Sequence, residues 1–245
     1  MEKSTAWPSL LLMVFLLLVI GGCNPENWNA GPPQAESQSV KLGEAKSARV
    51  EIDMPAGELS VGGGAKELLE ADFSYANPSS RPQVEYTVSA GQGRLTIRQP
   101  GSAHGRGSGH NTWDLHLSNK VPLELKVEQG AGRTRLILGG LSLSRLDVEI
   151  GAGETVVDLT GDWKNNLTAN IEGGVGRATV RLPSEVGVRA SAQGGIGAIH
   201  VHGLKRDGDA YVNEAYGKSP ITVEVHVEGG VGEINLELGE APPSV

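Results

Sequence analysis

The chain has 245 residues, and its composition is unusual in holding 35 glycines, a single cysteine and only 4% aromatic residues. With 38% hydrophobic and 20% charged residues it can bury a core, and without a Gly-X-Y period or further cysteines it is neither collagen nor a disulfide scaffold. The formal net charge of -8 argues against nucleic acid as a partner, because contact with phosphates needs a basic surface.

Residues 1–22 have the pattern of a secretory signal peptide. Lys3 lies close to the amino terminus, and an uninterrupted apolar run follows from residue 10 to residue 20. A helix of that length spans about 16 Å, whereas the hydrocarbon core of a bilayer is about 30 Å thick. The run is therefore too short for a membrane span and is typical of a signal-peptide core.

The signal ends in a motif for lipid attachment. Residues 19–23 (VIGGC) resemble the bacterial lipobox, and the resemblance implies cleavage before Cys23 and a diacylglycerol group on its sulfur. Two acyl chains hold a protein stably at a membrane. We therefore expect a lipid-anchored protein in the bacterial cell envelope, outside the cytoplasm, with the membrane as a partner through Cys23. The alternative is an unmodified cysteine behind an ordinary secretory signal.

The segment behind the cysteine is polar and interrupted by proline. Residues 23–40 show no apolar period, so the sequence predicts a flexible tether there. Residues 41–122 contain two imperfect strand-turn-strand patterns, at residues 52–61 and 91–97, and predict an irregular N-terminal β cap. The proline-containing residues 240–245 form a short tail.

A glycine repeat organises residues 123–239. Apolar residues alternate with polar ones on both sides of each glycine motif, which is the period of a β-strand with one buried face. The second glycines of successive motifs are separated by 21, 23, 21 and 35 residues. The Gly-x-Gly motifs are Gly130/Gly132, Gly151/Gly153, Gly174/Gly176, Gly195/Gly197 and Gly230/Gly232.

Two all-β architectures satisfy this repeat. In a β-solenoid each unit is one coil and equivalent strands stack in parallel, whereas in a meander or sandwich the strands pair antiparallel around the glycine turns. The position after the second glycine alternates in charge along the repeats, which favours stacking of equivalent positions. These residues are Arg133, Glu154, Arg177, Ala198 and Glu233. The sequence therefore predicts a single-stranded β-helix, or β-solenoid, of about 21-residue coils behind an irregular N-terminal cap.

The pattern resembles a known family. Residues 48–59 (ARVEIDMPAGEL), 71–75 (ADFSY) and 228–234 (EGGVGEI) are similar to the toast-rack family of bacterial extracytoplasmic proteins, over about residues 41–238. The resemblance implies a right-handed β-helix-like fold without established catalysis. Its relatives include adhesin-like proteins and proteins of envelope-stress signalling, and it brings no catalytic residues to this chain.

The best candidate for a metal site is a set of three histidines. His200 and His202 share one face of a strand, and His226 points outward by alternation with its neighbours. Zinc or copper accepts such ligands together with a carboxylate, and Glu237 stacks beside His202 if the intervening insert loops out. The alternative, which we prefer, is an ordinary solvated strand face. We therefore expect no metal and no cofactor.

The insert that lengthens the last repeat carries two candidate binding residues, Tyr211 and Tyr216. Their rings would suit stacking on sugars, although tyrosines in a long insert commonly fasten it to the body of the protein. No convergent catalytic set is visible, so we predict a non-enzymatic scaffold, adhesion or envelope-stress interaction module whose partner is an envelope protein or a glycan. The alternative function is a β-helix that binds or cleaves polysaccharide.

Overall fold

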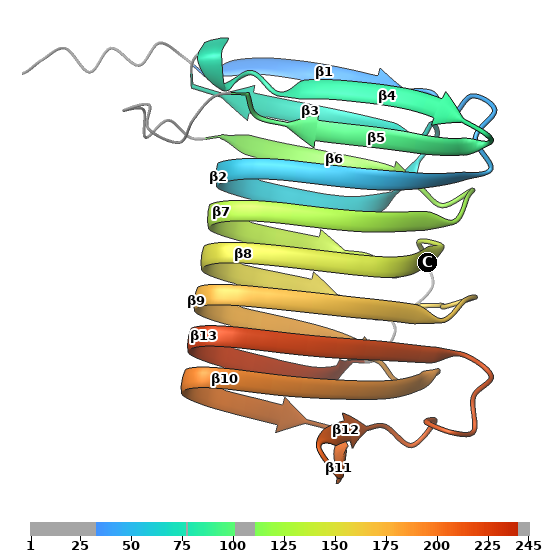
Figure 1. The fold of residues 1–245 in the computed structure, drawn as a ribbon, viewed down its shortest axis with the longest axis vertical. Helices are drawn as coiled ribbons and strands as arrows, with labels where there is room; N and C mark the ends of the chain where they lie inside the picture. Colours follow the sequence, from blue (N-terminus) through green and yellow to red (C-terminus); the bar gives the residue numbers. More distant parts are fainter. Residues whose placement is uncertain (1–32, 77, 101–110, 240–245) are drawn as a thin grey trace, which may run out of the picture.

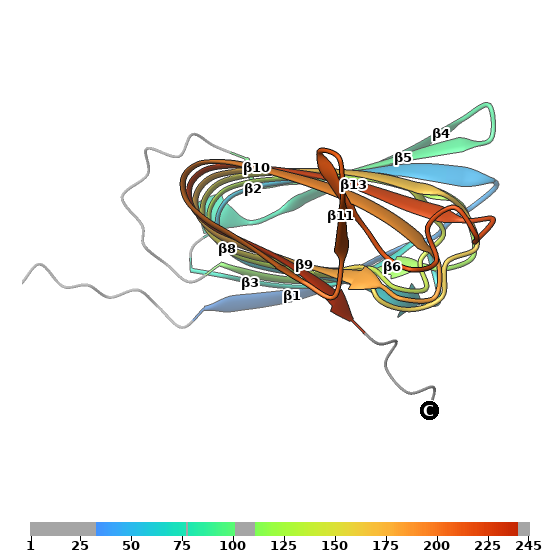
Figure 2. The same cartoon turned by 90° about the horizontal axis from the view of Figure 1, so that it is seen from below.

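The computed structural model describes residues 33–76, 78–100 and 111–239, and these form one sheet of 13 strands wound into a flattened solenoid (Figure 1). Seen along the solenoid axis, the coils lie over one another as narrow loops closed by a bend at one side (Figure 2). Within the described ranges, helical structure is limited to the short 3-10 turn η1 (Pro78–Ser80). The predicted all-β solenoid is thus confirmed.

Each regular coil is one long strand bent in its middle. A first arm precedes the bend and a second arm follows it, and equivalent arms of neighbouring coils pair in parallel. The alternating apolar residues of both arms point inward and are buried, as Leu125 and Val127 are on β7. The coil strands are β2 (Ser47–Ala65), β7 (Leu123–Ile137), β8 (Leu143–Asp158), β9 (Leu167–Pro183), β10 (Gly187–His202) and β13 (Thr222–Gly239).

The bends explain the glycine repeat. Gly176 has φ +139°, and a Cβ there would lie 1.8 Å from the carbonyl oxygen of Gly153 on the neighbouring coil. At the first glycine of the same motif, a Cβ on Gly174 would lie 2.3 Å from the carbonyl oxygen of Gly151. Backbones stacked this closely leave no room for a side chain, so Gly174 and Gly176 must both be glycine where β9 stacks on β8.

The stacking order differs from the chain order. The coils follow the order β2-β7-β8-β9-β13-β10, so the last strand of the chain lies between β9 and β10. The expected neighbourhood of Arg177 and Ala198 is therefore wrong, because Glu233 takes the position beside Arg177. The cause is the long connection after β10, which contains β11 (Lys205–Asp207) and β12 (Ala210–Val212) and returns the chain to the gap beside β9.

The regular stack begins earlier than the predicted boundary at residue 123. Strand β2 pairs with β7 in full register, with Gly57 opposite Gly132, and Gly57 has φ +142°. In the sequence this coil is an imperfect copy of the repeat, because Pro55 takes the place of the first glycine of the motif. Only the second glycine, which requires positive φ, is kept.

The N-terminal end is built from shorter strands. β5 (Gln92–Arg98) pairs with the first arm of β2 and β6 (Thr112–Ser118) pairs with its second arm, so together they form an interrupted coil. β4 (Gln83–Ser89) extends β5, while β3 (Leu69–Tyr75) and β1 (Gln34–Val40) extend β6. The tether predicted over residues 23–40 is therefore too long, because residues 34–40 hydrogen-bond to β3 as a strand.

The hydrophobic core lies between the two arms and runs the length of the stack. It is formed mainly by Leu, Val and Ile, and each fully buried side chain of this kind contributes about 1.5–3 kcal/mol. At the N-terminal end the rings of Trp113 and Phe73 pack edge to face with centroids 5.5 Å apart.

Several predictions fall on residues outside the described ranges. These are the signal peptide (residues 1–22), lipidation at Cys23, the tether up to residue 32 and the tail (residues 240–245). No helix in the part of the chain that the structure describes is long and apolar enough to cross a membrane.

Candidate functional site

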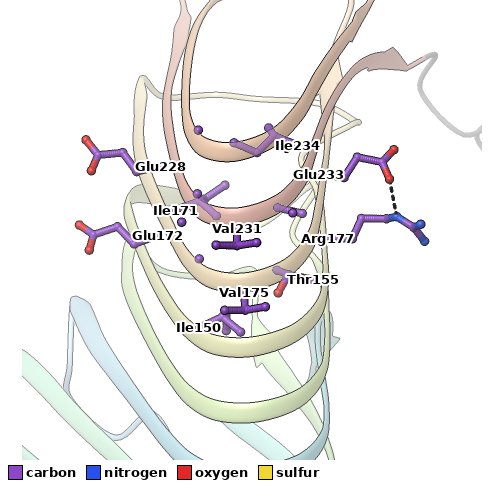
Figure 3. A pocket seen from close by; sticks show the side chains of 18 of the residues that line it. Ile150, Thr155, Ile171, Glu172, Val175, Arg177, Glu228, Val231, Glu233 and Ile234 are labelled. Carbon is purple, nitrogen blue, oxygen red and sulfur yellow. Dashed lines mark hydrogen bonds and ion pairs between the residues drawn. The ribbon is translucent and has the colours of Figure 1, made fainter.

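The bends of the coils form one continuous surface, which we call the bend face. It consists of three columns of side chains that stack from coil to coil (Figure 3). Glu172 and Glu228 belong to the first column, Val175 and Val231 to the second, and Arg177 and Glu233 to the third. The regular spacing follows from the parallel register, because each coil repeats the same position about 4.8 Å from the last.

The first column is acidic on five consecutive coils. Each member is in register with the next, and like charges directly opposite one another on adjacent strands repel. Sequence inspection missed this column, although its members stand at one offset, four residues before the second glycine. The column consists of Asp53, Glu128, Glu149, Glu172 and Glu228.

Part of the negative charge of this column is neutralised on β7 and β8. Lys126 forms ion pairs with Glu128 and Glu149, the second at 3.2 Å, and their hydrogen bonds raise the pKa of the Lys126 ammonium. Burial and the charge of Glu128 together raise the pKa of the Asp53 carboxyl, against the opposing effect of Arg98. Among the described residues, no cation lies within ion-pair distance of Glu172 or Glu228. The uncompensated negative charge is therefore concentrated on β9 and β13.

The second column is apolar and exposed, and it enlarges toward the end of the solenoid formed by β10. It is alanine on β2, β7 and β8 and continues as Val175 on β9, Val231 on β13 and Ile196 on β10. These last three side chains are 57%, 46% and 73% exposed. Exposed apolar groups gathered in one strip mark a surface suited to contact with another molecule.

The third column alternates in charge, as the sequence predicts. Arg133 Nη1 lies 2.8 Å from Glu58 Oε1, and Arg177 Nε lies 3.2 Å from Glu233 Oε2. Hydrogen bonds from Asn235 and from Arg177 lower the pKa of the Glu233 carboxyl. This column is close to internal neutrality, so the acidic column gives the bend face its net charge.

The shape and chemistry of the bend face suit a basic partner with apolar groups. An open depression of about 740 Å³ follows the acidic column from Asp53 to Glu228. Carboxylates there would attract lysine or arginine side chains, while Val175, Val231 and Ile196 would contact apolar groups beside them. Within the described ranges, no group of three or more His, Cys, Asp or Glu side chains is arranged to hold a metal ion.

The structure does not bring the three candidate histidines together. His200 and His202 lie on the second arm of β10, whereas His226 lies on the first arm of β13, so the bend turns them to opposite faces. His226 Nδ1 is 2.8 Å from Ser191 Oγ, and His200 Nε2 is 3.8 Å from Glu233. Glu237 does stand in register with His202, as expected if the insert loops out.

The insert holds its tyrosines close to the body of the protein. Tyr211 on β12 is opposite Ala190 of β10, and its half-buried ring packs against the core. Tyr216 lies in the following turn, which Asn213 fastens by accepting a hydrogen bond from Val188 N at 3.0 Å and donating one to Val186 O at 2.7 Å. This packing corresponds to the fastening role rather than to a free stacking platform for sugars.

Comparison with solved structures gives a match that covers most of both chains. A protein of Clostridium sporogenes whose name proposes a role in cell adhesion is 33% identical and superposes with a TM-score of 0.79, covering 84% of this chain and 100% of that one. The family model described as the N-terminal domain of toast_rack, DUF2154, matches residues 29–181.

More distant structures carry names that propose adhesins. A protein of Bacteroides fragilis is 10% identical with a TM-score of 0.31, covering 83% of this chain and 97% of its own. One of Parabacteroides merdae is 9% identical with a TM-score of 0.25, covering 83% and 96%. Similarity at this level supports no functional argument. No protein with a curated description matches the sequence.

Proposed function

The chain belongs to the toast-rack family, and from this we propose that it is a lipid-anchored, extracytoplasmic β-solenoid that acts as a non-catalytic adhesion module. The name of the Clostridium sporogenes protein supports adhesion, since the two chains are 33% identical over the whole of that protein. The lipobox-like residues 19–23 support an anchor on Cys23, which would hold the module at the outer side of a membrane.

The observation that carries the proposal is the bend face. Glu172 and Glu228 stand in register with no cation within ion-pair distance among the described residues, so their repulsion costs stability and is better explained by a partner that neutralises it. The adjoining apolar strip provides contact area, and the rigid stack holds both columns in fixed positions. We propose that the bend face binds basic, partly apolar segments of proteins on a neighbouring surface.

Two other roles receive less support. Polysaccharide binding through Tyr211 and Tyr216 would need exposed rings, whereas Tyr211 is packed against the core. The envelope-stress role that the family resemblance brings has no observation of its own in this chain. The proposal is therefore limited to adhesion, and glycan binding becomes an outcome of its test.

An attachment assay tests the proposal. Cells that produce the full chain would be passed under flow over surfaces coated with envelope protein or with glycan, beside cells that lack the chain. We expect retention on the protein surface, its loss in Cys23→Ala cells, and a marked decrease in cells carrying Glu172→Gln with Glu228→Gln. A matched control changes two exposed glutamates outside the bend face, Glu44→Gln with Glu185→Gln, and should leave retention unchanged.

Two results would contradict the proposal. Equal retention of cells with and without the chain would remove the adhesion role. Retention on the glycan surface alone, insensitive to Glu172 and Glu228, would favour the polysaccharide-binding alternative.

A further inference from the structure

The last coil of the solenoid has an open edge. β10 pairs with β13 from Gly187 to His202, but on its other side β12 pairs only with Arg189 and Ala190. Within the described part of the chain, residues 191–202 have no strand partner on that side. A row of unpaired backbone N–H and C=O groups is a template for one more strand.

This edge lacks the charges that usually protect an edge from pairing. Residues 190–204 contain no Asp, Glu, Lys or Arg. Three charged columns of the solenoid end one coil earlier: Gln193, Ala198 and His202 of β10 stand in register with Glu228, Glu233 and Glu237 of β13. Natural edge strands are commonly blunted by charged side chains, so a neutral edge here needs another explanation.

The opposite end of the molecule shows the usual protection. Glu36 on β1 forms an ion pair with Arg81 at 2.6 Å, and Glu85 on β4 forms one with Arg98 at 3.1 Å. The strands at that end thus carry charged pairs, whereas residues 190–202 of β10 contain no Asp, Glu, Lys or Arg.

The core is also incompletely covered at the β10 end. Ile199 is 39% exposed, whereas its equivalent on β13, Ile234, is 4% exposed. Val201 is half-buried, whereas its equivalent Leu236 is fully buried. Side chains placed for the core thus face solvent on the final coil.

A small apolar hollow lies behind this uncovered edge. The inward position that Ile150 fills on β8 is glycine on the last three coils, at Gly173, Gly229 and Gly194. The missing side chains leave a hollow of about 80 Å³ inside the bend, bordered by Ile171, Ile234 and Ile199 (Figure 3). Because Ile199 belongs to the terminal coil, the hollow reaches the open end.

We propose that the second arm of β10 accepts an extended, uncharged segment of a partner protein, which adds to the solenoid as a further strand. Backbone hydrogen bonds to residues 196–202 supply the affinity, and apolar side chains at alternate positions cover Ile199 and Val201. The occupant is a single strand rather than a second copy of the chain. The β11–β12 hairpin projects beyond β10 (Figure 1), and two copies would bring two such hairpins to the same junction.

A peptide based on the sequence of the neighbouring coil tests the inference. The probe is the segment 230–238 with Glu233→Ser and Glu237→Ser (GVGSINLSL), which keeps the apolar alternation and removes charge. The control peptide carries proline at position 235, which interrupts a ladder. Binding to the full chain in detergent micelles would be followed by fluorescence anisotropy, together with backbone hydrogen exchange. We expect saturable binding of the probe alone, and slowed exchange confined to residues 196–202.

Matched variants locate the contact. Ile199→Lys places a charge on the open edge and should weaken probe binding about tenfold or more. Val88→Lys makes a similar change at an exposed position of β4, 42% exposed, at the other end of the solenoid, and should leave binding unchanged. The exchange measurement on the unmodified chain provides a second test that does not depend on folding of the Ile199→Lys variant.

The outcomes separate this inference from the proposed adhesion through the bend face. Probe binding should persist in the Glu172→Gln, Glu228→Gln variant even if that variant loses attachment. The inference is overturned if slowed exchange appears at β1, at β4 or nowhere. It is equally overturned if the chain forms dimers that protect residues 191–202 without peptide, since the occupant would then be a second copy.

Discussion

Glu233 on β13 lies beside Arg177 on β9, with Glu233 Oε2 3.2 Å from Arg177 Nε, although the two residues are 56 positions apart in the chain. The contact exists because β13 is inserted between β9 and β10. It continues the alternating charge of the third column across a break in chain order. The pair therefore reports on the topology as well as on a local attraction.

Exchanging the two charges tests this topology. Arg177→Glu alone and Glu233→Arg alone should each lower the free energy of unfolding, because each places like charges opposite one another. The double exchange should recover about 0.2–1 kcal/mol, the usual coupling of an exposed pair. The midpoint and slope of urea unfolding give these values. A larger recovery from Arg177→Glu with Ala198→Arg would instead support stacking in chain order.

A substitution of a glycine in a bend should lower the free energy of unfolding far more than a substitution of a glycine that also has positive φ but lies in open space. Gly176→Ala would place Cβ 1.8 Å from a backbone oxygen at φ +139°, so we expect a loss of about 3 kcal/mol or more in the free energy of unfolding. Gly208 has φ +61°, and a Cβ added there would have no heavy atom within 4 Å, so Gly208→Ala should cost only about 1 kcal/mol. Urea unfolding of both variants checks the difference, and similar losses would contradict close stacking of the bends.

Neutralising one member of the acidic column should stabilise the protein. Glu172 stands in register between Glu149 and Glu228, so Glu172→Gln removes two repulsions and should raise the free energy of unfolding by about 0.2–1 kcal/mol. The gain should shrink in 1 M salt, where charges are screened within about 3 Å. Glu154→Gln serves as the control because Glu154 lies 3.8 Å from Arg133, and it should not stabilise. Destabilisation by Glu172→Gln at low salt would contradict repulsion within the column.

The N-terminal end should lose stability in acid through Glu36. Hydrogen bonds, first from Arg81 and then from Gln38 and Tyr75, lower the pKa of the Glu36 carboxyl from its ordinary 4.5 to about 2. Because the folded-state pKa is the lower one, this contribution is complete above about pH 4.5 and disappears as the pH falls toward 2. The decrease in urea midpoint between pH 5 and pH 2.5 should therefore be smaller in Glu36→Gln than in the unmodified chain. An identical decrease in both would show that the pair does not contribute.

Lipid attachment at Cys23 predicts a simple change in partitioning. The wild-type chain from bacterial membranes should enter the detergent phase of a phase-separating detergent, because two acyl chains anchor stably. Cys23→Ala should move to the aqueous phase or remain as an unprocessed precursor, which the two molecular masses distinguish. Incorporation of a labelled fatty acid into the wild-type chain alone provides the positive measurement. Labelling of the Cys23→Ala variant would exclude Cys23 as the site.

The sequence by itself determined the character of the coil. Alternation at residues such as Leu125 and Val127 defines a strand with one buried face, and the paired glycines at Gly174 and Gly176 mark a bend that only glycine can form. These signals are readable because they are local: each depends on the period of one strand or on the backbone conformation of one residue.

Only the tertiary structure decided which coils are neighbours, and therefore what the surfaces contain. The chain order placed Ala198 beside Arg177, grouped His226 with His200 and His202, and gave no hint that β10 ends the stack. A long insert allows the chain to return to a gap at little extra cost in loop entropy, so the order of coils depends on the pairing of distant strands and not on spacing along the chain. The acidic column and the open edge of β10 both arise from that pairing.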